Sequence, residues 1–250
     1  MEKISAILIT LNEEKNLEAC LESLRWVDEI VIVDCGSRDA TKEIALKYTD
    51  RFFHRAWDGY ARQKAHALSL ASNDWILSID ADERVTKELA AEIRRTVEAG
   101  ERDGYFIPRD NYFLGRRMTG GAWRRDRQMR LFRRSKVSIA ERPVHEGFEA
   151  AGETGELASP LLHFTNDSLA DAIRKMNAYT SLEAGELAPS RKSSGGAVVL
   201  RPLSAFLRNY VSRKGYRDGA HGLLLAMIAS LTTMLLYMKI WEIRRGRDNS

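Results

Sequence analysis

The chain has 250 residues, 44% of them hydrophobic and 30% charged, which is typical of a folded globular protein and excludes a disordered one. This length allows one large domain or one domain with an appendage, and Cys20 and Cys35 form no CxxC pair, so we expect free thiols in a reducing compartment. The formal net charge of +4 is a mild basic excess that suits an acidic small molecule, a membrane surface or nucleic acid and selects none of them.

The first 100 residues alternate between strand and helix patterns. Apolar runs predict strands over residues 4–10, 29–34, 51–56 and 75–80. Apolar residues at helical spacing predict helices over residues 12–26, 39–49, 60–71 and 85–100, the last one closed by Gly100 as its C-cap. Strands that are apolar throughout and alternate with amphipathic helices indicate an α/β fold, with a parallel sheet covered by helices on both faces.

The pattern changes after Gly100. Extended segments are predicted over residues 104–118, 127–139, 144–150 and 160–166, and the chain is helical again from Ser168 onward, with a loop over residues 188–197. The first residues, MEKISAILITLNEE, turn acidic too early for a signal peptide, which predicts a cytoplasmic protein.

One segment near the C-terminus suits a membrane. Residues 220–238 contain no Asp, Glu, Lys or Arg, and their length is close to the roughly 20 residues that span a bilayer. Ser230, Thr232 and Thr233 lie inside this segment and basic residues flank it, so a buried hairpin or an interfacial helix is an alternative to a span. We expect docking at the surface rather than insertion.

Polar motifs follow three of the predicted strands. These motifs are TLNEE, DCGSRDAT and DADE. Ligands of parallel sheets bind at the carboxyl ends of the strands, so all three would line one edge of the sheet. Each motif taken alone is also compatible with an ordinary turn.

Asp80 and Asp82 follow a buried strand, one residue apart. Two carboxylates this close repel unless a positive charge lies between them. A Mg²⁺ or Mn²⁺ ion held together with a phosphate would supply that charge, because such ions take oxygen ligands from carboxylates and substrate phosphates. The alternative is that Asp82 caps the following helix and Asp80 is solvated.

These motifs resemble a known family. The segments ILITLNEEKNLEACLESL, EIVIVDCGSRDAT and DWILSIDADE look like the nucleotide-sugar half of family 2 glycosyltransferases with the GT-A fold. The resemblance implies that Asp34 contacts the base and that Thr10, Asn12, Glu13 and Ser37 line the nucleotide pocket. It also implies that Asp80 and Asp82 bind the metal and the diphosphate, and that Arg62 and Lys64 lie near the phosphates.

The second half is similar to the lipopolysaccharide core glucosyltransferase branch of that family. The similarity lies in GGAWRRDRQMRLFRR, VHE and LLHFTN and in the helical tail. It implies transfer of a sugar, expected to come from a UDP-sugar, to a lipid-anchored saccharide of the lipopolysaccharide inner core. Eight arginines lie between Arg116 and Arg134, and they suit phosphates of such an acceptor or form a solvated face. Nucleic acid is disfavoured as a partner.

An inverting transfer needs a general base that takes the proton of the acceptor hydroxyl. The family's usual Glu-Asp pair is missing after the metal motif. Glu146 in VHE holds the comparable place and is our expected base, with Asp126 as the second candidate. Glu146 could instead be a surface carboxylate. By resemblance to other GT-A enzymes, His163 is a candidate ligand of the metal or the diphosphate, although a lone histidine is more often a structural hydrogen-bonding group.

The sequence therefore predicts a metal-dependent, inverting glycosyltransferase. We expect a GT-A domain over residues 1–167, divided into a nucleotide-sugar half (1–100) and an acceptor half (101–167), and a membrane-associated helical region over 168–250. The expected location is the cytoplasmic face of the inner membrane, peripheral or monotopic, and homo-oligomers are left open. The alternatives are a nucleotidyltransferase, a phosphohydrolase that uses the same carboxylate pair, and a non-catalytic nucleotide-sugar-binding protein.

Overall fold

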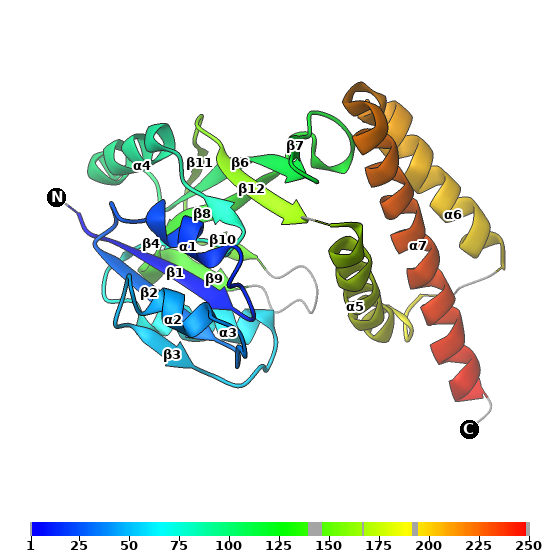
Figure 1. The fold of residues 1–250 in the computed structure, drawn as a ribbon, viewed down its shortest axis with the longest axis horizontal. Helices are drawn as coiled ribbons and strands as arrows, with labels where there is room; N and C mark the ends of the chain where they lie inside the picture. The colour runs from blue at the N-terminus through cyan, green and yellow to red at the C-terminus, as the bar shows by residue number, and fades with distance from the viewer. Residues whose placement is uncertain (1, 140–146, 167, 192–194, 249–250) are drawn as a thin grey trace. The chain divides into compact units, whose positions relative to one another are not determined.

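A computed structural model describes residues 2–139, 147–166, 168–191 and 195–248 (Figure 1). The chain forms two compact units. The first unit consists of Met1–Asp110 and Arg127–His163, and the second of Asn111–Asp126 and Phe164–Ser250. The domain boundaries expected from the sequence stay a prediction.

The elements of the first unit follow the predicted alternation of strands and helices. They are β1 (Ile4–Thr10), α1 (Leu17–Glu22), β2 (Glu29–Asp34), α2 (Thr41–Ala45), β3 (Phe52–His54), α3 (Tyr60–Leu70), β4 (Trp75–Ser78), β5 (Glu83–Arg84), α4 (Lys87–Ala99), β6 (Gly104–Phe113), β8 (Arg127–Arg133), η2 (Arg134–Lys136), β9 (Val137–Ile139), β10 (Phe148–Ala150), β11 (Thr154–Glu156) and β12 (Leu161–Asn166). Strands β6 and β12 continue into the second unit.

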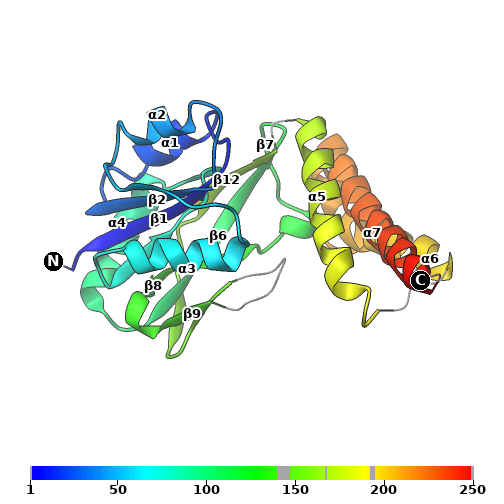
Figure 2. The same cartoon turned by 90° about the horizontal axis from the view of Figure 1, so that it is seen from below.

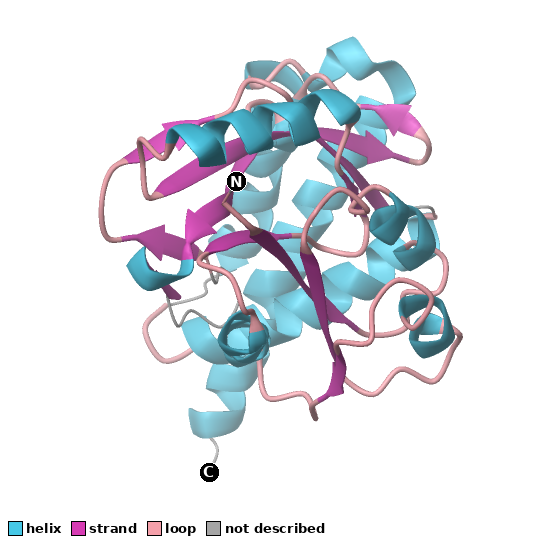
Figure 3. Ribbon diagram, turned by 90° about the vertical axis from the view of Figure 1, so that its left-hand side faces the viewer, coloured by secondary structure: helices cyan, strands magenta, loops and turns pink. Residues whose placement is uncertain are grey.

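The strands form one mixed sheet in the order β3-β2-β1-β4-β8-β6-β12-β5. Strands are drawn as magenta ribbons in Figure 3. The four strands from the first part of the chain are parallel, as predicted, and β8 pairs antiparallel with β4. Strand β11 also pairs with β6, in parallel, and β9 and β10 form a separate antiparallel pair. The predicted α/β class is confirmed.

Alternate side chains of β1 pack into two different hydrophobic clusters. Ile4, Ala6 and Leu8 face a cluster that contains side chains of α1 and α4, whereas Ile7 faces a cluster that contains side chains of α3. Figure 2 shows α3 on one side of β1 and β2, and α1 and α2 on the other. Helices therefore cover both faces of the parallel strands, as the apolar runs predicted.

Helix α4 ends at Gly100 as predicted but begins at Lys87, two residues later than expected, whereas α1 is much shorter than expected. The Thr86 side chain accepts a hydrogen bond from the Leu89 amide at the start of α4, and Gly100 closes that helix with φ 62°. Helix α1 has six residues because Asn12 adopts φ 55° and the residues after it bond to a neighbouring loop before the helix starts.

The second unit is mainly helical. Its elements beyond the strand ends are β7 (Arg116–Arg117), η1 (Gly121–Trp123), α5 (Leu169–Leu187), α6 (Gly195–Leu207), η3 (Arg208–Ser212, a π-helical turn), η4 (Gly215–Asp218) and α7 (Gly219–Asp248). Helices α5 and α6 both pack against α7. Among the described residues, one helix, over Gly215–Gly246, is long and apolar enough to cross a membrane by length and composition.

Candidate active site

The order of the strands defines where a ligand can bind. From β1 the chain moves outward to β2 and β3, and then returns to the other side of β1 for β4. Such a reversal leaves a crevice at the carboxyl ends of the two strands that flank it. Thr10 at the end of β1 pairs with Asp34 at the end of β2, and the Ile79 amide donates to the Ile7 carbonyl at 3.1 Å. Asp34 and Asp80 therefore lie at the same edge of the sheet.

Asp34 organises the loop after β2. Its carboxylate accepts hydrogen bonds from the Gly36 amide (2.9 Å), the Ser37 amide (2.8 Å), the Ser37 hydroxyl (2.5 Å) and the Thr10 hydroxyl (3.0 Å). Gly36 has φ 102°, a conformation that favours glycine. Burial, helped by the charges of Asp34 and Asp58, raises the pKa of the Cys35 thiol to about 11, so this thiol stays protonated at neutral pH.

Hydrogen bonds join the loop after β1 to the loop after β2. The Asn12 amide donates to the Ser37 hydroxyl at 2.7 Å, and the Asn12 side-chain oxygen accepts from the Arg38 amide at 2.9 Å. The Glu13 amide donates to the Thr41 hydroxyl at 2.8 Å. The structure thus brings together all five residues that the resemblance assigned to the nucleotide, which are Thr10, Asn12, Glu13, Asp34 and Ser37.

The positive charge beside Asp80 belongs to an arginine. Arg130 on β8 is 4% exposed, and its Nη2 pairs with Asp80 Oδ2 and, at 2.6 Å, with Glu83 Oε1. Glu83 is fully buried, accepts from the Asp80 amide at 2.9 Å, and pairs with Arg109 at 3.3 Å. Burial alone would raise the pKa of Asp80, but Arg130 and Lys64 outweigh it and hold this pKa well below its usual range.

Asp82 lies beside a histidine. Strand β12 pairs with β5 so that His163 stands opposite Glu83, and this register brings His163 Nε2 to 3.6 Å from Asp82 Oδ2. Both side chains are largely buried but keep some exposure, at 14% for His163 and 18% for Asp82. The two residues are more than 80 positions apart in the sequence, and the pairing of β12 with β5 brings them together.

The residues near Asp82 fit a divalent cation that a second ligand helps to hold. A carboxylate oxygen and an imidazole nitrogen at this separation can bind one ion, and Mg²⁺ or Mn²⁺ commonly takes its remaining ligands from substrate phosphates and water. Within the described ranges, no three or more His, Cys, Asp or Glu side chains are grouped for a metal. Phosphate oxygens would therefore have to complete the coordination.

Helix α3 contributes one of its two predicted phosphate-binding residues to this neighbourhood. The charge of Lys64 acts on Asp80, whereas that of Arg62 acts on Asp58. Arg62 instead lines a cavity of about 430 Å³ on the α3 side of the unit, together with Arg134 and Val137. Their roles at a diphosphate stay a prediction.

Of the two candidate bases, the structure describes Asp126 but not Glu146. Asp126 belongs to the second unit, and its Oδ2 accepts a hydrogen bond from the buried Asn111 side chain at 3.0 Å. Glu146 lies outside the residues that the structure describes. The assignment of the base thus stays a prediction for both.

Sequence reasoning missed three members of this site: Glu83, Arg109 and Arg130. The signal was present for Arg130, which interrupts the apolar run Met129 to Phe132 and had to find a partner if that run was a buried strand. Which carboxylate it would meet depended on the pairing of β8 with β4, and no local pattern indicates that pairing.

Comparison with known proteins identifies the family of the chain. The profile of Glycosyl transferase family 2 matches residues 5–153. The chain is 36% identical over 248 residues to the lipopolysaccharide core biosynthesis glycosyltransferase LpsC of Rhizobium meliloti (strain 1021), covering 96% of this chain and 92% of that one. It is 29% identical to an uncharacterized glycosyltransferase of Rickettsia felis, covering 97% and 90%.

A solved structure shares the fold. S. aureus TarS 1-349 in complex with UDP has a TM-score of 0.50 at 16% identity, covering 98% of this chain and 92% of that one. The fold is that of a glycosyltransferase of the GT-A type. The chain belongs to glycosyl transferase family 2, which confirms the resemblance drawn from the three motifs.

Proposed function

We propose that the protein transfers a sugar, with inversion, from a nucleotide-sugar donor to a lipid-anchored saccharide of the lipopolysaccharide inner core. The relative named for lipopolysaccharide core biosynthesis supports this acceptor, because its similarity to this chain extends over almost the full length of both proteins. The UDP bound to TarS is consistent with a UDP-sugar donor.

One observation carries the proposal. Asp80 and Asp82 follow β4 at the edge of the sheet where Asp34 ends β2, and His163 lies 3.6 Å from Asp82. A nucleotide-sugar needs both a surface for its nucleoside and a cationic neighbourhood for its diphosphate. The loops after β1 and β2 would supply the first, and the Asp82–His163 pair with Lys64 would supply the second.

Different residues of the first unit would bind the nucleoside and the diphosphate of the donor. Asp34 and Ser37 would hold the base and ribose, with Thr10, Asn12 and Glu13 around them. Asp82 and His163 would hold a Mg²⁺ or Mn²⁺ ion, and Asp80 would lie beside it. When bound, the ion offsets negative charge on the leaving nucleoside diphosphate. Arg130 pairs with both Asp80 and Glu83, and its charge holds the pKa of Asp80 well below its usual range, so Asp80 stays ionised.

The acceptor hydroxyl must lose a proton as it attacks the anomeric carbon. We propose Glu146 for this step and Asp126 as the second candidate. For Asp126, the hydrogen bond from Asn111 would keep one carboxylate oxygen in place. In either case the base acts on the face of the sugar opposite the leaving diphosphate, which gives inversion.

We place the protein at the cytoplasmic face of the inner membrane. A nucleotide-sugar is a cytoplasmic metabolite and a lipid-anchored acceptor lies in the membrane, so the two meet only at that surface. Helix α7 supports this location, since it is apolar over a stretch of membrane-spanning length. We expect peripheral or monotopic attachment.

A screen of nucleotide-sugars tests the donor. Purified protein is heated with each nucleotide-sugar in the presence of Mn²⁺ or Mg²⁺, and binding stabilises the folded state by mass action. We expect one uridine nucleotide-sugar to raise the unfolding temperature, and to release nucleoside diphosphate on prolonged incubation. A nucleoside monophosphate product would favour the nucleotidyltransferase alternative instead.

A further inference from the structure

The helical second unit contains a cavity that donor chemistry does not use. It has a volume of about 240 Å³ and lies between α6, α7 and the segment that follows α5. The residues that matter for its chemistry are Arg191, Arg201, Ser204, Arg208, Thr233 and Tyr237. Three arginines and three hydroxyl-bearing side chains thus line one small cavity, and among the described residues no carboxylate lines it.

The ring of Tyr237 brings two of these positive charges together. Tyr237 is buried, and the guanidinium carbons of Arg201 and Arg191 lie 5.0 and 5.7 Å from its ring centroid. Arg244 fixes the segment that carries Arg191, because it donates to the carbonyls of Ala188 (3.1 Å) and Arg191 (3.3 Å). Cation–π contacts offset part of the repulsion between the arginines but leave their hydrogen-bond donors available.

The backbone near Arg201 and Arg208 is also set by unusual local structure. Pro202 lies inside α6, and its carbonyl accepts a hydrogen bond from the Ser230 hydroxyl of α7 at 2.9 Å, which ties this turn of α6 to α7. Arg208 begins the π-helical turn Arg208–Ser212. Such turns are rare and occur often at functional sites.

These three arginines have no acidic partner in the part of the chain that the structure describes; no ion pair joins any of them to a carboxylate. Like charges gathered without a counter-charge favour an anion. Guanidinium groups match phosphate oxygens with paired hydrogen bonds, and the hydroxyls of Ser204 and Thr233 suit the remaining oxygens.

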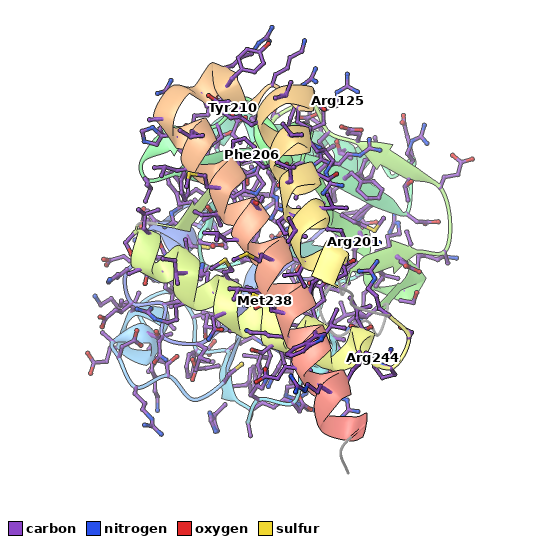
Figure 4. All side chains as sticks on the ribbon, turned by 90° about the vertical axis from the view of Figure 1, so that its right-hand side faces the viewer. Arg125, Arg201, Phe206, Tyr210, Met238 and Arg244 are labelled. Atoms are coloured by element: carbon purple, nitrogen blue, oxygen red, sulfur yellow. The ribbon has the colours of Figure 1, made fainter. Side chains whose placement is uncertain are left out.

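Exposed apolar side chains on the helices that line the cavity indicate a lipid headgroup phosphate rather than a free phosphate. Val199 and Leu200 are each 66% exposed and Leu203 is 53% exposed, all on the same helix as Arg201. On α7, Met238 is 46% exposed (Figure 4, where Arg201 and Met238 are labelled). A free phosphate would leave these apolar side chains in water, whereas a lipid supplies acyl chains to cover them.

We propose that this cavity binds the headgroup phosphate of an anionic lipid, with α6 lying in the head-group boundary and its exposed apolar side chains against acyl chains. The inference deepens the membrane docking proposed above and rests on it, but it does not depend on the reaction at the first unit. It also assigns docking chiefly to α6 rather than to the α7 segment alone.

Vesicle binding by the full-length protein tests the proposal. The vesicles contain phosphatidylcholine alone or equal parts of phosphatidylcholine and phosphatidylglycerol, and bound protein is measured by flotation. We expect strong binding only with phosphatidylglycerol, and about tenfold or greater loss in the double variant Arg201→Gln/Arg208→Gln. The matched control, Arg25→Gln/Arg174→Gln, removes two exposed arginines elsewhere and should stay close to the unchanged protein.

A charge-conserving variant distinguishes a specific phosphate site from nonspecific electrostatic attraction to the anionic vesicle surface. Arg201→Lys/Arg208→Lys keeps both charges but loses the paired hydrogen bonds, so we expect several-fold weaker binding. Binding equal to that of the unchanged protein would overturn the site and leave only general attraction. Equal loss in the control variant would do the same.

Two further readouts distinguish a lipid-headgroup site from a site for free phosphate, and separate both from the proposed sugar transfer. If inorganic phosphate at constant ionic strength displaces the protein from vesicles and raises its unfolding temperature, the cavity takes free phosphate and the lipid assignment is wrong. Release of nucleoside diphosphate from a soluble donor should be unchanged in all three variants. The experiments can therefore disprove lipid binding at the cavity without disproving the proposed sugar transfer, and can disprove the transfer without disproving lipid binding.

Discussion

At the scale of single residues, the cluster of Asp80, Glu83 and Arg130 decides how the site folds. Two carboxylates share one buried guanidinium, which is itself 4% exposed. Removing one member of such a cluster leaves the others buried without compensation, and that costs far more than the cluster contributes when it is intact.

Arg130→Met should therefore destabilise the protein by about 3–5 kcal/mol at pH 7. The pKa of Asp80 is depressed in the folded state, so its stabilising contribution is present above the unfolded pKa and is lost as pH falls through the folded one. Without Arg130 this pKa rises, and the deficit of the variant should shrink between pH 7 and pH 5. Urea unfolding at both pH values measures the difference.

Arg127→Gln is the matched control on the same strand. Arg127 pairs with Glu156, but both side chains are about half exposed, so the loss should stay below about 1 kcal/mol. Similar losses in the two variants would show that the Arg130 cluster is not the stabilising feature we describe.

The general base is the second prediction at this scale. Glu146→Gln should retain donor affinity and lose transfer by about 10²-fold or more, since it removes the proposed proton acceptor while every proposed donor-binding side chain is unchanged. Asp126→Asn should have the smaller effect. Transfer rates and donor affinities of the two purified variants decide between them, and the reverse pattern would exchange the assignments.

At the scale of elements, the local sequence patterns predicted the strands and helices that depend on local burial and capping. The apolar runs of β1, β2 and β4 and the capped helix α4 follow from burial and from Thr86 and Gly100. The order of β8, β6, β12 and β5 could not be predicted, because pairing between distant strands leaves no periodic signal. For this reason the motif residues at Asp34 and Asp80 were found from the sequence and Arg130 was not.

Asp218 holds one element of the second unit against another. Its carboxylate is 2% exposed and accepts from the Thr119 amide (3.0 Å), the Thr119 hydroxyl (2.7 Å) and the Gly120 amide (2.8 Å). Asp218 therefore helps to anchor the segment that leads to Asp126, together with the hydrogen bond from the Gly121 amide to the Arg213 carbonyl at 3.1 Å.

Asp218→Ala should leave the amides of Thr119 and of the buried Gly120 without their acceptor and destabilise this unit by about 2–4 kcal/mol. Because Thr119 and Gly120 then lose their anchor, hydrogen exchange at residues 118–126 should accelerate more than exchange in β1 and β2. Thr119→Val keeps the amide bonds and loses only the hydroxyl bond, so its effect should be clearly smaller. Uniform acceleration over the whole chain would contradict a local anchor.

At the scale of the whole molecule, the composition indicated a membrane only through residues 220–238. The structure extends the apolar surface to α6, whose exposed Val199 and Leu200 precede that segment. The sequence left this helix unmarked because Arg201 and Pro202 interrupt its apolar run, and their packing against Tyr237 and Ser230 is a tertiary feature.

If the protein docks on the membrane surface and α7 does not span the bilayer, salt and alkaline carbonate should extract it without detergent. High salt should release part of the full-length protein from vesicles that contain anionic lipid, because screening weakens the attraction of arginines to the surface. Alkaline carbonate should release most of the remainder. Resistance to both, with extraction only by detergent, would mean that α7 spans the bilayer.

The central claim is metal-assisted transfer of a sugar at the Asp82–His163 pair. The most direct measurement is the mass of a lipopolysaccharide inner-core acceptor after incubation with a nucleotide-sugar, with Mn²⁺ or Mg²⁺ and with a chelator. Metal-assisted transfer predicts one added sugar with metal, none with chelator, and none for Asp82→Asn even though that variant unfolds at the same temperature as the unchanged protein. Full transfer by Asp82→Asn, or by the unchanged protein in chelator, would contradict it.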